Sequence, residues 1–267
     1  SRNQKEASPA FAKSFFDSIA MDFFIGIYHL FLYQPVFNAL VWLSQTMPGQ
    51  DFGVAVILLT LAVRGISYPL GAQGVRAQKK LAEIQPKIKE IQETYKNKRE
   101  EQTRAIMELY KVAKVNPFAM FLPILIQLPI FIVLYQVFSH GIQPEQFSLL
   151  YSFVQAPEAI DAMFLGLVNL NERSLALAVF AGVLQFVQFK QASPKRAKKK
   201  DGAKPDISSL MQTQMAYIFP VVIVWITATL PAAFALYWIT STIFSLWQYW
   251  FIAAREQHAK QGAIANN

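Results

Sequence analysis

Residues 52–70 form a run that is apolar enough to cross a membrane, yet it carries one full positive charge, Arg64, near its middle. A guanidinium keeps its proton at physiological pH, because its pKa lies above about 12, so burial cannot neutralise it. Placing such a charge at the centre of a bilayer costs at least about 2.5 to 3.5 kcal/mol on insertion scales. The fold must therefore supply Arg64 with polar partners, with water, or with both.

The composition and its arrangement predict an all-α polytopic membrane protein. The chain is 54% apolar and 16% charged, whereas an average soluble domain carries about 25% charged residues. The apolar residues come in long uncharged blocks rather than in short alternating runs, which is typical of membrane-spanning helices. With no cysteine, three widely separated histidines and no Gly-rich phosphate loop, the chain predicts no metal site, no nucleotide site and no other cofactor.

The order of apolar and charged blocks predicts five membrane spans. We expect a flexible N-terminal segment (1–22), an interfacial amphipathic helix (23–50), the first span (51–75), a helical hairpin outside the bilayer (76–116), the second span (117–140), a loop on the opposite side (141–172), the third span (173–190), a basic loop (191–206), the fourth span (207–230), the fifth span (232–254) and a polar tail (255–267). Two apolar cores, 174–189 and 215–230, hold only 16 residues each. That is about 24 Å of helix against a hydrocarbon core of about 30 Å, so these spans would thin the bilayer.

Two of these segments lie outside the core of the expected bilayer. Residues 23–45 are apolar and aromatic, but Pro35 interrupts them and polar side chains dilute them, so an interfacial helix is favoured over a span. A position across the membrane stays open as the alternative. The hairpin is predicted from an apolar seam at helical spacing, made of Leu81, Ile84, Ile88, Ile91 and Tyr95.

The distribution of Lys and Arg predicts the orientation of the chain. Of the 25 basic residues, 11 lie in 76–114 and seven lie in 190–204. Cytoplasmic segments of membrane proteins carry the excess of basic residues. Both segments are therefore expected in the cytoplasm, with the N-terminus outside and the C-terminus inside.

No Asp or Glu lies in the apolar core of any expected span, so an ion pair within the membrane is not available to Arg64. Neutral polar side chains are available instead, namely Thr60 on the same helix and, on other spans, Gln127, Gln185, Gln188, Tyr237 and Ser241. Together with water, such groups would solvate the charge in a hydrated pocket lined by several helices. Taken one at a time, each is better explained by hydrogen bonding between packed helices.

Four runs of sequence resemble the YidC-type membrane protein insertases and their mitochondrial oxidase-assembly and chloroplast albino-type relatives. The runs are TLAVRGISYPL (60–70), YKVAKVNP (110–117), FLPILIQLPIFIVLY (121–135) and FPVVIVWITATLPAAFALYWITS (219–241). The resemblance covers about residues 31–255, with every segment in family order. It implies a five-span core around a hydrophilic groove that opens to the cytoplasm and to lipid and is closed outside, together with a mobile hairpin that is needed for activity.

The resemblance also implies roles for individual residues. Arg64 matches the Arg of the family's groove, and Thr60 matches the polar residue one turn before it. Tyr237 and Trp238 match an aromatic pair that contacts substrate. We expect the remaining polar residues of the spans to line the same groove, which adds Gln127, Gln185, Gln188 and Ser241. We expect the chain to depart from the family in having no extra N-terminal span, no large periplasmic domain and no lipidated N-terminal Cys. Its short tail carries one further basic residue, Lys260, so we expect weak tail-mediated binding to the ribosome.

The resemblance predicts an insertase that performs no enzymatic bond chemistry. It would move short polar tails of nascent membrane proteins through the groove and release their hydrophobic segments into lipid. Its expected location is a bacterial plasma (inner) membrane rather than a thylakoid or mitochondrial inner membrane. The expected partners are nascent membrane proteins and the lipid bilayer, with the ribosome and the Sec translocon as further candidates and no specific nucleic-acid sequence.

Two alternatives of other classes remain open. The first is a transporter of small solutes or anions in which Arg64 is the binding site, although the two halves of the chain show no repeat of the kind common in transporters. The second is a passive scaffold that assembles other membrane subunits without moving any segment across the bilayer.

Overall fold

The computed structural model describes residues 23, 25–96, 98–116, 122–140, 144–157, 161–192 and 207–265. The expected flexible segment 1–22 and nearly all of the basic loop 191–206 lie outside the described residues. The described elements, in chain order, are η1 (His29–Tyr33), α2 (Gln34–Thr46), η2 (Pro48–Gln50), α3 (Phe52–Ile66), α4 (Tyr68–Thr94), α5 (Arg99–Val112), α6 (Leu122–His140), η4 (Pro144–Leu149), β1 (Met163–Phe164), β2 (Val168–Asn169), α7 (Leu175–Ala192), α8 (Ile207–Thr229) and α9 (Ala232–Ala265). This part of the chain is mostly helical, which confirms the all-α prediction at that level.

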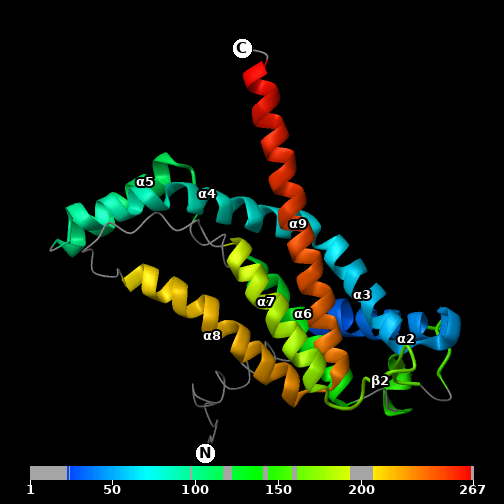
Figure 1. The fold of residues 1–267 in the computed structure, drawn as a ribbon. Coiled ribbons are helices and arrows are strands. Elements are labelled where there is room, and N and C mark those ends of the chain that lie inside the picture. Colours follow the sequence, from blue (N-terminus) through cyan, green and yellow to red (C-terminus); the bar gives the residue numbers. More distant parts are fainter. Residues whose placement is uncertain are drawn as a thin grey trace, which may run out of the picture.

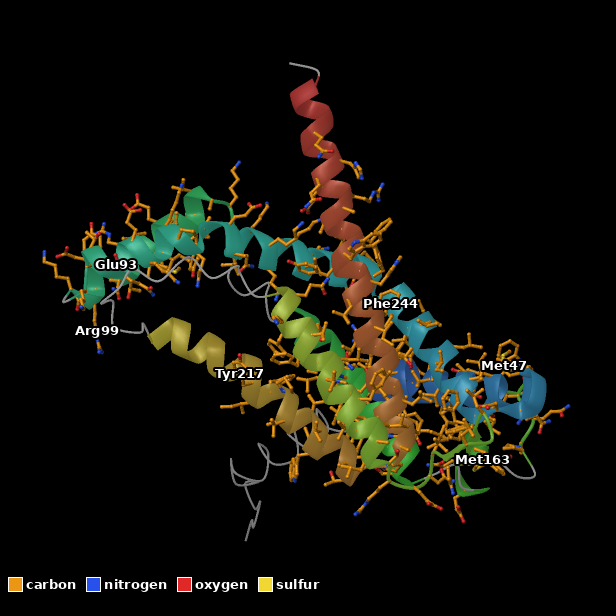
Figure 2. All side chains as sticks on the ribbon, in the orientation of Figure 1. Met47, Glu93, Arg99, Met163, Tyr217 and Phe244 are labelled. Atoms are coloured by element: carbon orange, nitrogen blue, oxygen red, sulfur yellow. The ribbon has the colours of Figure 1, made fainter. Side chains whose placement is uncertain are left out.

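The helices are arranged around α9, the longest of the described elements (Figure 1). The helix α3 packs along α9, α7 packs against both α8 and α9, and α2 packs across α3. The hairpin of α4 and α5 projects to one side, near the end where the C-terminal part of α9 extends beyond the other helices (Figure 1). Figure 2 shows charged side chains along this hairpin, with Glu93 and Arg99 near its tip.

Measured by length and hydropathy, no single helix among the described residues qualifies as a membrane span, while α3 and α4 qualify as a pair bent by 68°. The bend falls at Ser67, where the sequence predicted an unbroken span over 51–75. Pro69 explains the break, because in a continuous helix it would have no N–H to donate to the carbonyl of Gly65 and its ring would clash with that carbonyl. The hairpin's first helix consequently begins at Tyr68 instead of residue 76.

The prediction that Pro35 interrupts the first apolar segment is wrong. The π-turn η1 leads directly into α2, and every residue at the junction keeps helical backbone angles. The Gln34 N–H bonds to the carbonyl of His29, five residues back, so the ladder widens just before the proline that cannot donate. The helix therefore continues through Pro35, which lies in the first turn of α2.

The main core lies where α2, α3, α6 and α9 meet. Its fully buried side chains include Phe37, Leu40, Val41, Val56, Val133 and Phe234. The opposite face of η1 and α2 is apolar and exposed, with Phe31 at 71% and Trp42 at 46% of full exposure. A helix that is buried on one face and exposes aromatic side chains on the other fits the predicted interfacial position, which stays a prediction.

The described parts of the segment 141–172 are folded onto α2 and α9. The strands β1 and β2 pair as an antiparallel hairpin, and the Leu165 N–H donates to Asp51 Oδ2 at 2.6 Å. Asp51 also caps α3 by accepting from the Val54 N–H at 3.0 Å. The first N–H groups of α9 are satisfied by the same segment, because Ala232 donates to the carbonyl of Glu172. The loop is therefore part of the packed structure at this end of the bundle.

The last helix continues past the predicted end of the fifth span, so most of the expected tail 255–267 is helical. Its extension is tied to α4 by an ion pair between Lys79 and Glu256. Gln248 Nε2 donates to the carbonyl of Tyr68 at 2.9 Å. Its amide oxygen would lie 2.9 Å from a Cβ placed on Gly71. These contacts hold the first turns of α4 against α9 just beyond the bend.

Candidate polar groove site around Arg64

Arg64 lies in the last turn of α3, three residues before the bend, and its side chain is half-buried. Its Nε donates to Ser241 Oγ of α9 at 2.7 Å. Its Nη2 donates to Gln127 Oε1 of α6 at 2.6 Å and also to Ser241 Oγ. Three helices that are distant in the sequence thus meet at one guanidinium.

Gln127 joins Arg64 to a further residue of α9. Its Oε1 accepts from Arg64, and its Nε2 donates to the hydroxyl of Tyr237. Both bonds fix which way the amide faces, with the oxygen toward the guanidinium. Tyr237 is 2% exposed, so its hydroxyl is held between the helices rather than at a surface.

The hydrogen-bond partners of Arg64 among the described residues are neutral. Within the described part of the chain, the ion pairs join Lys79 to Glu256 and Lys98 to Glu101, and Arg64 bonds to no carboxylate. The partners are one amide oxygen and one hydroxyl, each of which accepts without cancelling the positive charge. The site therefore presents positive charge and hydrogen-bond donors, which suit an anionic or polar guest and do not suit a metal cation.

Thr60 lies one turn before Arg64 on α3 but is not part of the hydrogen-bond network of Arg64. Its hydroxyl donates to the carbonyl of Val56 at 2.6 Å within its own helix, and the side chain is buried. Such a bond to the preceding turn satisfies the hydroxyl donor without a second helix. Of the two predicted site residues on α3, only Arg64 takes part in the network.

Gln185, Gln188 and Trp238 form a second, separate network. Trp238 Nε1 donates to Gln185 Oε1 at 2.9 Å, and Gln185 Nε2 donates to Gln188 Oε1 at 2.8 Å. Successive side chains on a helix diverge by about 100°. Tyr237 and Trp238 are neighbours on α9, and their hydrogen bonds accordingly join different helices, α6 for Tyr237 and α7 for Trp238, although the Trp238 ring also packs against Phe131 of α6. The sequence placed all these polar residues in one groove, whereas the structure divides them between two hydrogen-bonded sets.

Three residues outside the predicted site also determine its geometry. Gln248 and Gly71 hold α4 against α9 next to the bend, and Asn38 fastens α2 to the loop at the other end. Gly71 shares a helical face with Arg64 in the sequence, which is a signal for close packing. Gln248 and Asn38 carry no local signal for these contacts, because the carbonyls of Tyr68 and Leu149 that they bond are more than a hundred residues away.

The chain matches the family model of the 60Kd inner membrane protein over residues 42–260. It is 32% identical over 207 residues, 78% of its length, to the membrane protein insertase YidC of Francisella tularensis subsp. novicida (strain U112). The same values hold for the membrane protein insertase YidC of F. tularensis subsp. tularensis (strain SCHU S4 / Schu 4). The matched region is 33% of the length of these relatives. All residues of the Arg64 network, namely Arg64, Gln127, Tyr237 and Ser241, lie inside the family match.

Proposed function

The chain belongs to the 60Kd inner membrane protein family, the family of the YidC insertases, and from this we propose that it inserts proteins into a bacterial inner membrane. The proposed substrates are nascent membrane proteins with short polar tails, and the lipid bilayer receives their hydrophobic segments. The observation that carries the proposal is Arg64, a permanent charge held by neutral partners from two other helices. An acidic tail that enters the groove supplies an anionic partner, which Arg64 does not have among the described residues.

The surface of the described helices supports a position within lipid. Large apolar side chains are exposed along the outer faces of α3, α7 and α8, among them Leu61, Ile66, Val179, Val183, Val221 and Trp225. Exposed apolar surface of this extent marks a membrane or protein contact. With α3, α6, α7, α8 and α9 as the five spans, the projecting hairpin lies on the cytoplasmic side, the N-terminus outside and the C-terminus inside.

The proposed pathway has three steps. The cytoplasmic hairpin, which exposes Met107 and Val112 on α5, receives the hydrophobic segment of a nascent chain. The tail then enters the groove, where Arg64 attracts its acidic residues. Membrane potential and partitioning into lipid drive the last step, because acidic residues move outward down the potential.

Tyr237 and Trp238 differ in what they offer a substrate. Tyr237 is buried to 2% exposure and bonded to Gln127, so it acts through Gln127 rather than by touching the substrate in this conformation. Trp238 is half-buried, with its ring against Phe131 and Phe234, so only the exposed part of its side chain is open to a passing apolar segment. The ribosome and the Sec translocon remain predicted partners.

Reconstitution tests the proposal directly. The purified chain is placed in liposomes with a single-span substrate whose tail carries acidic residues, and translocation is measured by protection of the tail from protease. Arg64→Ala is expected to slow insertion roughly 10- to 150-fold, because a charge-assisted hydrogen bond contributes about 1.5 to 3 kcal/mol. The matched control is Arg255→Ala, which removes an exposed positive charge of α9 that stacks on Phe251.

Each outcome selects among the three function classes. Undiminished insertion by Arg64→Ala would refute the role of the groove charge. Failure of the unaltered chain to insert any substrate would favour a passive assembly scaffold. Arg64-dependent leakage of small anions from liposomes that contain no substrate would favour a transporter.

A further inference from the structure

The hydrogen bonds of Arg64 use up particular edges of its guanidinium. A guanidinium carries five N–H donors, and a carboxylate can bind two of them in parallel along either of two edges. One edge is formed by Nε and Nη2, and the other by Nη1 and Nη2. Two-point binding along an edge is the strongest and most selective contact that an arginine makes with a carboxylate.

Both edges are occupied by the protein. Ser241 Oγ lies in the fork between Nε and Nη2 and accepts from both nitrogens. Gln127 Oε1 takes the other donor of Nη2, the one that borders Nη1. Among the described residues, Nη1 has no hydrogen-bond partner, so it is the nitrogen left for a guest.

We infer that Ser241 and Gln127 mask the two edges of Arg64, so that substrate carboxylates bind through Nη1 alone and are released readily. This inference rests on the proposed insertase function and deepens it. A carboxylate on one nitrogen keeps the electrostatic attraction but loses the second parallel bond that gives an arginine its selectivity. An insertase that must pass many different tails needs attraction without retention.

The mask is held in place by the helices themselves. Ser241 is 3% exposed on α9, so its hydroxyl cannot swing away from the fork without repacking. Gln127 is anchored at its other end by the Tyr237 hydroxyl, which keeps the amide oxygen toward Arg64. Tyr237 is thus a positioning residue that acts on Arg64 through Gln127.

Removing the mask should convert Arg64 into a retaining site. The experiment uses the full chain in lipid nanodiscs and a fluorescent single-span substrate whose tail holds one glutamate, with a glutamine version as reference. The dissociation rate of each substrate is measured by chase with unlabelled substrate. Ser241→Ala opens the fork between Nε and Nη2, and the glutamate substrate should then leave about tenfold more slowly relative to the glutamine substrate.

A double variant separates masking from a general change in packing. An ammonium cannot bind a carboxylate along an edge. In the Arg64→Lys background, Ser241→Ala should therefore change the ratio of the dissociation rates of the glutamate and glutamine substrates by less than about twofold. Gln127→Leu offers a second route, because it opens the edge between Nη1 and Nη2 and should also slow release of the glutamate substrate. It serves as the test if Ser241→Ala does not fold.

The inference is overturned if the unaltered chain inserts both substrates and Ser241→Ala or Gln127→Leu fails to slow dissociation of the glutamate substrate relative to the glutamine substrate. It is also overturned if the ratio rises equally in the Arg64→Lys background. If the unaltered chain inserts neither substrate, the proposed function fails and this inference falls with it.

Discussion

Replacing Asn38 with alanine tests how the described loop residues are fastened to α2. The Asn38 side chain is 2% exposed and donates to the carbonyls of Gln34 and Leu149, at 2.8 and 2.9 Å. Its Oδ1 accepts from the backbone N–H of Tyr151 at 2.6 Å. One amide therefore bonds two points of the loop to a buried position of the helix.

The expected loss can be worked out from the partners that remain. The carbonyl of Leu149 keeps a bond from Gln34 Nε2 at 3.0 Å, so it stays satisfied without Asn38. The Tyr151 N–H loses its acceptor, and a partly buried donor left without a partner costs about 1 to 3 kcal/mol. Local opening of the loop should become easier by that amount, which corresponds to a rise of roughly 5- to 150-fold in amide exchange at Tyr151.

Site-resolved hydrogen exchange of the chain in detergent micelles measures this directly. The matched control is Gln45→Ala, whose exposed side chain also bonds the loop, to the carbonyl of Gln155 at 2.7 Å, and which should change exchange at Tyr151 by less than about threefold. An increase below about threefold at Tyr151 in Asn38→Ala would show that the loop is held by other contacts. The reasoning from a stranded donor would then be refuted.

Two further predictions concern how helices are held together. Lys79→Glu places like charges where Lys79 now pairs with Glu256, and should raise the rate of proteolysis within the hairpin about two- to fivefold. The double exchange Lys79→Glu/Glu256→Lys should restore the original rate. An unchanged rate in the single variant would exclude the pair as a restraint on α4. Gly182→Ala puts a methyl group against the side chain of Val224 between α7 and α8, and should lower the free energy of unfolding by about 1 to 3 kcal/mol, as measured by thermal unfolding. Gly65→Ala is the control, because Gly65 has open space around it, and it should not lower the free energy of unfolding. Equal melting temperatures for the two variants would contradict close packing at Gly182.

Local rules predicted much of the helical framework from the sequence. Apolar blocks and polar breaks located α7 and the start of α9 to within two residues, and the apolar seam located the hairpin. The helix of the fourth expected span, α8, begins at Ile207 in polar sequence and is therefore longer than its apolar core. The predicted length of 16 residues describes that apolar core and not the whole helix. Pro35 and Pro69 show the limit of a local rule, because the helix runs through one proline and bends just before the other.

The sequence predicted which polar residues belong to the site, but not which of them bond to one another. Residue type and apolar surroundings selected Arg64, Gln127, Ser241 and Tyr237, which the structure joins. The same signals selected Gln185, which bonds to Trp238 instead. Which polar groups meet depends on how the helices rotate about their axes, and that is set by packing over the whole bundle. Periodicity within one helix does not contain this information.

The bend and the absence of an acid in the described surroundings of Arg64 have a common physical consequence. Because the helix stops at Ile66, Arg64 occupies the last turn of α3 rather than the middle of a continuous span. Unpaired carbonyls at a helix C-terminus carry partial negative charge and favour a cation there by about 0.3 to 1 kcal/mol. Together with the amide and the hydroxyl, this offsets part of the cost of burying the guanidinium while leaving its net charge intact. A carboxylate on a neighbouring helix would offset that cost more fully, but it would also pair with the charge and weaken the proposed attraction for an incoming tail. Among the described residues, Arg64 is stabilised by dipoles rather than by an opposite charge, and this leaves its positive charge available.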